Sequence, residues 1–175
     1  MSFVTQNTFN IHQSKGQPGA ISRTSQPFLL DNNDYIAGEE LKPGYGVLRY
    51  DGKYYRPKSG DAAYIIGIVN YVPQSLNRTF TQRTGNNPGE IVINPGDSFQ
   101  IMLSGHAYVA LASTVQRHDA AEFSVDENAW KVATKNEYAN PIFFEESGVA
   151  GDIVSVRING LIRTFKDVQR ENLLD

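Results

Sequence analysis

The sequence predicts an all-β protein: a single β-sandwich or barrel-like domain, of the jelly-roll or tulip-like kind, with an extended N-terminal arm. One sequence motif, which we call the Gly-Asp phrase, occurs twice, at residues 95–105 and 150–160. In each copy the Gly-Asp pair at the second and third positions is followed by alternating apolar residues and then by a second glycine. An Asp-Gly pair joins two β-rich runs between residues 44 and 57, which is a strong short-range hairpin signal. Turn signals also recur at short spacing along about ten short strands, as in sandwiches and barrels.

The composition is that of an ordinary globular domain. The 175 residues suffice for one domain with a single core, and 40% hydrophobic and 20% charged residues are usual values. The net charge of −3 and the scattered Lys and Arg side chains give no basic surface for nucleic acid. No apolar run approaches the ~20 residues needed to cross a bilayer, and the N-terminus lacks the pattern of a secretory signal. We therefore expect neither nucleic-acid nor membrane partners.

Residues 1–27 differ from the rest of the chain and predict an extended N-terminal arm. They are rich in Gln, Asn, Ser and Thr, are interrupted by proline and glycine, and carry isolated apolar residues such as Phe3 and Phe9. Such a segment cannot bury enough apolar surface by itself to offset its ordering entropy. It could dock by adding a strand to a partner's sheet. We place the β-sandwich or barrel domain at residues 28–165 and a charged C-terminal tail at residues 166–175.

Two stretches in the first half of the domain predict strands. Residues 47–56 form a predicted hairpin around Asp51-Gly52, because these residue types accept the positive φ that a two-residue turn needs. Residues 63–72 are rich in β-branched and aromatic side chains and predict a central strand. Gly67 within it indicates a bulge or close packing.

The two Gly-Asp phrases predict a turn, a strand, a tight turn and a second strand. Pro95-Gly96 suits the centre of a type II turn, because proline presets φ and glycine accepts a positive φ. Ser104-Gly105 and Asn159-Gly160 lie where a two-residue hairpin loop would need a tolerant residue. The residues to which we assign structural turn roles are Asp51, Gly52, Gly96, Asp97, Gly105, Gly151, Asp152, Asn159 and Gly160.

The chain carries no recognisable catalytic or cofactor motif: no Gly-rich phosphate loop, no His-Glu-x-x-His and no nucleophile elbow. The absence of cysteine excludes disulfides, thiolate catalysis and zinc–thiolate sites. His118, Asp119 and Glu122 come closest to a metal-ligand set, since His118 and Glu122 could share a helix face. Without a second histidine, a charged loop is the favoured interpretation. We therefore expect no catalytic residues, no cofactor, no bound metal and no enzymatic activity.

Tyrosines crowd into one third of the chain. The set comprises Tyr35, Tyr45, Tyr50, Tyr54, Tyr55, Tyr64 and Tyr71. They could form an aromatic platform that binds sugars, or they could serve cross-strand packing and subunit contact, because tyrosine combines apolar area with a polar tip. Packing and subunit contact explain the same residues with fewer assumptions.

The motifs also follow a distinctive order. The series is Gly16 to Ala20, Arg23, Phe28-Leu29-Leu30, Gly44 to Val47, Ile66 to Val69, Pro95-Gly96-Asp97 with its strand and Gly105, Trp130 to Ala133, and Ala150 to Gly160. This series spans most of the chain and resembles the structural cement, or head decoration, proteins of tailed bacteriophages. The segment after Phe165 and the polar stretch at residues 77–89 have no counterpart in that resemblance.

The resemblance implies a non-enzymatic virion protein, made in the host cytoplasm, that binds the outer face of a phage capsid. It would bridge neighbouring major capsid protein subunits and stabilise the head. We expect a homo-oligomer with closed symmetry, a trimer before a dimer. The candidate capsid-docking residues are Phe3, Phe9, Ile11, Pro18 and Arg23.

The residues leave two other function classes open. The first is a carbohydrate- or receptor-binding β-sandwich module of a phage tail or surface protein, which glycan binding would favour. The second is an enzyme built on a cupin-like or lyase barrel. Three scattered histidines argue against the cupin, because cupins need His and Glu clustered on adjacent strands.

Overall fold

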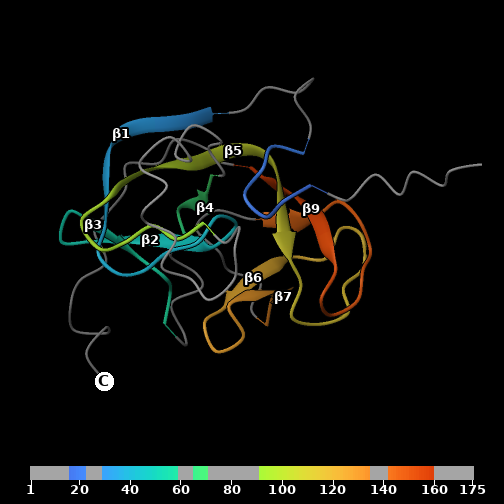
Figure 1. The fold of residues 1–175 in the computed structure, drawn as a ribbon. Helices are drawn as coiled ribbons and strands as arrows, with labels where there is room; N and C mark the ends of the chain where they lie inside the picture. The colour runs from blue at the N-terminus through green and yellow to red at the C-terminus, as the bar shows by residue number, and fades with distance from the viewer. Residues whose placement is uncertain (1–15, 23–28, 59–64, 71–90, 135–141, 160–175) are drawn as a thin grey trace, which may run out of the picture.

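The computed structural model describes residues 16–22, 29–58, 65–70, 91–134 and 142–159 (Figure 1). The regular structure in these ranges consists of β-strands, which confirms the predicted all-β class. The strands are β1 (Leu29–Ala37), β2 (Gly46–Tyr50), β3 (Lys53–Tyr55), β4 (Gly67–Val69), β5 (Ser98–Ala110), β6 (Ala121–Ser124), β7 (Ala129–Val132), β8 (Ile142–Phe144) and β9 (Ile153–Ile158).

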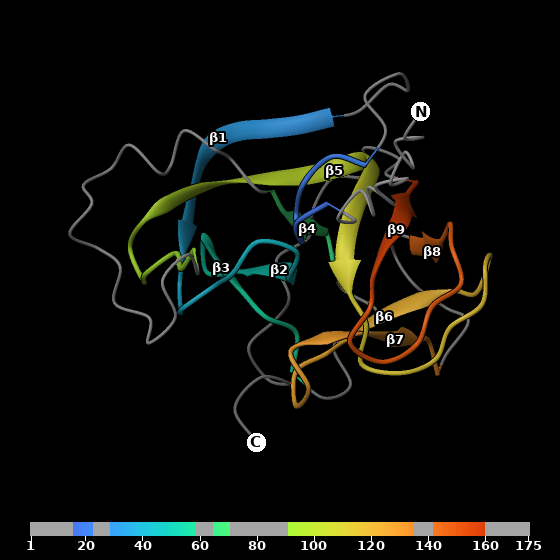
Figure 2. The same ribbon diagram turned by 45° about the vertical axis from the view of Figure 1, so that its right-hand side comes forward.

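Five strands close into a barrel, which we call lobe 1. Their order is β1-β3-β2-β4-β5, and β1 pairs in addition with β5, which completes the ring (Figure 2). Lobe 1 thus consists of β1 to β4 and the first half of β5, residues 98–104. The β2–β3 hairpin forms where the sequence predicts it, with φ of 48° at Asp51 and 73° at Gly52. Positive values at both positions are what a type I′ turn requires.

The second half of β5 and strands β6 to β9 form lobe 2. Residues 105–110 of β5 pair with β9, and β9 pairs with β8. The antiparallel β6–β7 hairpin is linked to β8 by the bridge between Ala120 and Phe143. It is linked to the end of β5 by the bridge between Leu111 and Trp130. A single strand of 13 residues, β5, is therefore common to both lobes.

The turn predicted at Gly105 is wrong. The expected hairpin at Ser104-Gly105 does not form, because β5 continues through both residues to Ala110. Ser104 pairs with Leu29 of β1, whereas Gly105 pairs with Ile158 of β9, so the strand changes partners between them. Gly105 has a φ of 123°, and Figure 2 shows β5 bending as it passes from one lobe to the other. The conformational tolerance of glycine thus serves a bend within a strand rather than a turn.

The second phrase ends where the described residues end. Asn159 directly follows the last residue of β9, and Gly160 lies outside the described ranges. The predicted Asn159-Gly160 turn therefore stays a prediction.

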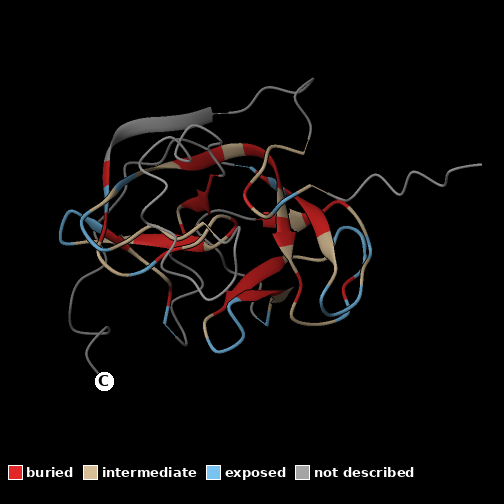
Figure 3. Cartoon of the chain, in the orientation of Figure 1, coloured by how far each residue is buried: buried red, intermediate tan, exposed pale blue. Residues whose placement is uncertain are grey.

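Buried residues lie along the strands of both lobes (Figure 3). The buried apolar side chains form two clusters, one within lobe 1 and a larger one that extends from lobe 1 into lobe 2. The lobe 1 cluster contains Tyr35, Ala37, Leu41, Val47, Tyr54, Val69, Ile101 and Leu103. The larger cluster includes Ile68 and Met102 together with the core of lobe 2, namely Ala107, Val109, Leu111, Val115, Phe123, Trp130, Ile142, Phe144, Val154, Val156 and Ile158. The side chain of Tyr45 packs against both clusters.

Both Gly-Asp phrases begin with the same aspartate-capped turn. In residues 94–97 the amide of Asp97 donates to the carbonyl of Asn94 (3.0 Å), and the Asp97 carboxylate accepts the amide of Asn94 (3.2 Å). Residues 149–152 repeat this pair of bonds, with lengths of 3.0 Å for both. The third residue of each turn is a glycine with positive φ, 90° at Gly96 and 88° at Gly151. These values suit a type II turn.

A third copy of this turn occurs at residues 116–119, where the sequence has no glycine to indicate it. The amide of Asp119 donates to the carbonyl of Gln116 (3.1 Å), and the Asp119 carboxylate accepts the amide of Gln116 (2.8 Å). His118 takes the place of the glycine, with a φ of 75°. A β-carbon in this conformation costs roughly 1–2 kcal/mol, so the turn is held by its surroundings rather than by local preference.

Candidate functional site

Residues 16–22 lie along the edge of β5 and act as an additional strand of the same chain. The amide of Gly19 donates to the carbonyl of Tyr108 (2.7 Å), and the amide of Tyr108 donates to the carbonyl of Ala20 (2.9 Å). The amide of Ser22 donates to the carbonyl of His106 (2.9 Å). This segment falls within the predicted arm, yet its backbone hydrogen bonds join it to the body of the protein.

Side-chain contacts also hold residues 16–22 against the body of the protein. Ile21 is half-buried and packs against the larger core cluster. The hydroxyls of Ser22 and Ser155 lie 2.5 Å apart and form a hydrogen bond between the segment and β9. The segment thus contacts two strands of lobe 2.

Two Pro-Gly turns interlock at the boundary between the segment and lobe 1. Gly19 and Gly44 occupy the third positions of turns at residues 17–20 and 42–45, with φ of 81° and 87°. A β-carbon on Gly19 would lie 2.7 Å from the amide nitrogen of Gly44, and one on Gly44 would lie 2.6 Å from Cβ of Pro18. Both positions therefore need glycine for two reasons: the left-handed backbone and the lack of space.

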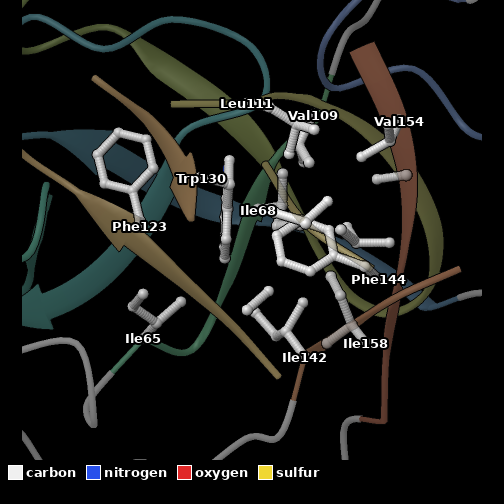
Figure 4. Packing of buried hydrophobic residues seen from close by; sticks show 14 of the residues in the cluster. Ile65, Ile68, Val109, Leu111, Phe123, Trp130, Ile142, Phe144, Val154 and Ile158 are labelled. Carbon is white, nitrogen blue, oxygen red and sulfur yellow. The ribbon is translucent and has the colours of Figure 1, made fainter. Parts of the chain in front are cut away.

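Trp130 connects this boundary to lobe 2. Its indole Nε1 donates to the carbonyl oxygen of Gly44 at 2.7 Å, and the residue is only 1% exposed. The Trp130 ring meets Phe123 edge-on, with ring centroids 5.6 Å apart. Figure 4 shows the indole between Phe123 and Phe144 within the core. The tryptophan of β7 thereby ties lobe 2 to the turn that precedes β2.

An apolar pocket of about 240 Å³ opens at this junction. Its walls come from the N-terminal segment, the turn before β2, the end of β5 and the β6–β7 hairpin. The lining residues are Gln17, Pro18, Lys42, Pro43, Gly44, Tyr45, Ile91, Ala110, Asn128 and Trp130. Pro18, which the sequence singles out as a docking candidate, is therefore a wall of this pocket.

A second connection between the lobes is made by Arg56, just beyond β3. Its backbone amide donates to Oε1 of Glu39 (2.5 Å), and its Nη2 lies 3.2 Å from Oε2 of the same carboxylate. Nη1 donates to Oδ1 of Asn128 in the β6–β7 hairpin (2.7 Å). The hydrogen bond that the Arg56 side chain donates to the Glu39 carboxylate is the main cause that raises the pKa of Arg56, against the opposing effect of partial burial. The guanidinium thus stays charged while it links lobe 1 to lobe 2.

The residues considered as metal ligands serve separate structural contacts. His118 is exposed at the third position of its turn, and the Asp119 carboxylate caps that turn. Glu122 is buried, lies 3.5 Å from Nζ of Lys131, and accepts the amide and hydroxyl of Thr134 (3.0 and 3.1 Å). Within the described residues, no group of three potential metal ligands is found. A helix long and apolar enough to cross a membrane is likewise not found there.

Two of the clustered tyrosines pack inside lobe 1. Tyr35 and Tyr54 are buried and meet edge-on, with ring centroids 4.7 Å apart, and Phe99 joins them at 5.9 Å from Tyr54. These rings belong to neighbouring strands, so cross-strand packing accounts for them. Tyr64 and Tyr71 lie outside the described residues.

The sequence did not reveal the pairing of residues 16–22 with β5. The other arm residues proposed for docking, Phe3, Phe9, Ile11 and Arg23, lie outside the described ranges. The signal that could have indicated the pairing is the second Pro-Gly pair at residues 43–44, which matches the pair at residues 18–19. The match between the two pairs does not by itself establish that the two turns meet.

Comparison with known proteins identifies the class to which this all-β fold belongs. Residues 5–159 match the family described as structural cement protein (E217 gp24/Pam3 gp6). The fold is also similar to a chain in a solved structure of the capsid of Myoviridae phage XM1. In that comparison the TM-score is 0.50 at 16% sequence identity, covering 95% of this chain and 100% of the other. A search of curated proteins gives no match.

The chain therefore belongs to the phage structural cement protein family, as its motif order had indicated. Family membership assigns it a structural role in a phage capsid and a location in the virion. It also makes capsid proteins its partners in assembly.

Proposed function

We propose that this protein binds the outer face of a phage capsid and bridges neighbouring major capsid protein subunits, which stabilises the head. The observation that carries the proposal is the family match over residues 5–159. We further propose that the protein acts without catalysis. We also propose that it forms a homo-oligomer, because closed symmetry is the rule among soluble oligomers, and we expect a trimer before a dimer.

The described geometry supports a bridging role through its internal connections. The N-terminal segment, Trp130 and Arg56 each join parts of the chain that are distant in sequence. A bridge between capsid subunits must hold its two contact surfaces at a fixed separation. Two lobes that share one strand and are linked by these contacts meet that requirement.

In this proposal the arm upstream of Gly16 supplies capsid contacts. Phe3 and Phe9 are isolated aromatic residues in a polar stretch, and anchoring side chains of this kind are worth about 1–3 kcal/mol each when buried. Arg23, which directly follows residues 16–22 in the sequence, adds a cationic group.

The test is co-sedimentation with undecorated capsids of the cognate phage. The full chain should pellet with the capsids, and the double variant Phe3→Ser/Phe9→Ser should lose most of its affinity. The double variant Asn7→Ala/Asn10→Ala is the matched control and should bind like the parent. Decorated heads should also release their DNA at a higher temperature than bare heads.

Two outcomes would contradict the proposal. Binding of the full chain to a glycan array, without binding to capsids, would favour the carbohydrate-recognition alternative. Full-strength capsid binding by Phe3→Ser/Phe9→Ser would leave a capsid role but remove the arm from it.

A further inference from the structure

The strands of lobe 2 repeat the arrangement of lobe 1, which closes in the order β1-β3-β2-β4-β5. In lobe 2 the second half of β5 is linked to β7 by the parallel bridge between Leu111 and Trp130, and β7 pairs with β6. Ala120, which precedes β6, bridges to Phe143 of β8, β8 pairs with β9, and β9 pairs with β5. Lobe 2 is therefore a second five-stranded ring in the same order, and its one parallel link matches the parallel pair of β1 and β3.

Backbone hydrogen bonds beside the strands match as well. In lobe 1 the amide of Gly44 donates to the carbonyl of Val69 (2.9 Å), and in lobe 2 the amide of His118 donates to the carbonyl of Phe144 (2.7 Å). Gly44 and His118 both have a positive φ, 87° and 75°. Reciprocal pairs of bonds join Leu41 to Ile93 in lobe 1 and Val115 to Gly148 in lobe 2. His118 is thus the lobe 2 counterpart of Gly44.

The outer surface of lobe 1 is covered by lobe 2. Gly46, Ile68 and Met102 pair in a row across β2, β4 and β5. Ile68 and Met102 are 0% exposed and belong to the larger core cluster, which extends into lobe 2. A β-carbon on Gly46 would lie 3.2 Å from Cη2 of Trp130 in β7. This row of lobe 1 therefore lies at the interface between the lobes.

The counterpart row in lobe 2 is exposed. It consists of Ala120, Phe143 and Arg157, which pair across the start of β6, β8 and β9. Phe143 is half-buried, and the side chain of Arg157 is 45% exposed where lobe 1 has the fully buried Met102. In the turn that leads to Ala120, His118 is exposed, whereas its counterpart Gly44 is buried. The surface that lobe 1 buries against its neighbour is thus open in lobe 2.

The exposed surface is rich in hydrogen-bond donors. Arg117 and His118 are exposed, and neither side chain has a partner among the described residues. In the same part of the chain Arg157 is paired only through Nε, 3.5 Å from Oε1 of Glu145, so its two Nη groups are available. The nearby carboxylate of Asp119 accepts the amide of Gln116 (2.8 Å) and so does not neutralise these groups.

We propose that this face of lobe 2, formed by Arg117, His118, Phe143 and Arg157, binds a carboxylate-bearing loop of a capsid protein. The inference rests on the capsid role proposed above and assigns a surface to it. An apolar partner, including an apolar patch on a second copy, would leave the Arg157 guanidinium buried without a counter-charge, which is costly. Carboxylates provide charge-assisted bonds to the same groups. Arginine and aromatic side chains are also the types enriched in protein interfaces.

The first test is co-sedimentation of Arg117→Glu with undecorated capsids. Urea unfolding followed by circular dichroism checks that the fold is retained. We expect binding to weaken about tenfold, because the reversed charge would face carboxylates. The matched control is Lys53→Glu, which makes the same change of charge on an exposed residue of lobe 1 and should bind like the parent.

The outcomes separate this inference from the capsid role itself. Equal binding by Arg117→Glu and the parent would overturn the inference and leave the capsid role intact. Equal losses in Arg117→Glu and Lys53→Glu would also overturn it, because net charge rather than this face would then control binding. Failure of the parent to pellet with capsids would contradict the proposed function, and the inference with it.

A photo-crosslinker in place of Phe143 identifies the partner directly. With p-benzoylphenylalanine at this position, irradiation of decorated capsids should join the chain to a capsid protein at a peptide that contains Asp or Glu, as read by mass spectrometry. The control position is Tyr55, a half-buried aromatic residue of lobe 1, which should not crosslink to that peptide. A crosslink from position 143 to a second copy of the chain or to DNA would overturn the inference. So would the absence of any crosslink in particles that carry the labelled protein.

Discussion

The indole nitrogen of Trp130 donates a hydrogen bond to the carbonyl oxygen of Gly44 at 2.7 Å, across 86 residues of sequence. Both groups are buried, and each would be costly to leave without a partner. The bond therefore fixes the position of β7 relative to the turn that interlocks with the N-terminal segment. It is the contact on which the connection between the lobes is most easily tested.

Replacing Trp130 with Phe keeps an aromatic ring but removes the donor. The carbonyl of Gly44 is then left buried without this partner, which costs ~1–3 kcal/mol, in addition to the loss of ring volume. We expect urea unfolding, followed by circular dichroism, to show a lower midpoint with an unchanged slope. A midpoint equal to that of the parent would mean that the bond contributes nothing to stability.

The interlocked glycines provide a matched pair of substitutions. Gly44→Ala must accommodate a β-carbon 2.6 Å from Pro18, whereas Gly96→Ala has a similar φ and no atom within 4 Å. We expect Gly96→Ala to cost ~1–2 kcal/mol through the left-handed backbone alone. Gly44→Ala should cost ~1–3 kcal/mol more, because overpacking adds to the same backbone term. Equal losses in urea unfolding would show that the two turns do not interlock tightly.

Truncation tests which part of the arm belongs to the fold. A chain that begins at Gly16 keeps all described hydrogen bonds, while one that begins at Ser25 loses those between residues 16–22 and β5. Three backbone bonds at ~0.5–1.5 kcal/mol each, together with the half-buried Ile21, predict a clear loss of stability for the shorter chain. Thermal melting should place the Ser25 chain well below the Gly16 chain, with a β-type spectrum in both. Coincident melting curves would show that the segment is not needed for folding.

His118→Gly should stabilise the protein. The histidine adopts a φ of 75°, and glycine removes the steric penalty of ~1–2 kcal/mol at the expense of a more flexible unfolded chain. We expect a net gain below ~1 kcal/mol. Asp51→Gly, at a φ of 48° in the exposed β2–β3 turn, is the control and should gain less, because Asp tolerates the left-handed region better. A loss of stability in His118→Gly would indicate that the histidine side chain makes a contact that outweighs its strain.

Local signals predicted the local structure well. Asp51-Gly52 and the Pro95-Gly96 and Gly151-Asp152 elements form turns because their residue types restrict the backbone wherever they occur. Gly67 was expected to mark a close approach, and a β-carbon there would lie 2.5 Å from Cγ2 of Ile101 and from the carbonyl oxygen of Met102. The order of the motifs also led to the correct family.

The features that were missed depend on contacts between distant parts of the chain. Gly105 carries the same local signal as a hairpin glycine, and only its exchange of partners from β1 to β9 shows that the strand continues. The turn at His118 has no glycine, so tertiary contacts must impose its backbone. The pairing of residues 16–22 with β5 was hidden by a polar composition typical of free termini. The bond between Trp130 and Gly44 has no sequence signal.

The strand shared by both lobes has a mechanical consequence. Hydrogen bonds in an antiparallel ladder run perpendicular to the strands, so a pull along β5 loads the bonds to β1, β4 and β9 together rather than one after another. Separating the two lobes by such a pull requires many bonds to break at once. In the proposed bridging role, a force that draws the two lobes apart along β5 would therefore load these ladder bonds in shear.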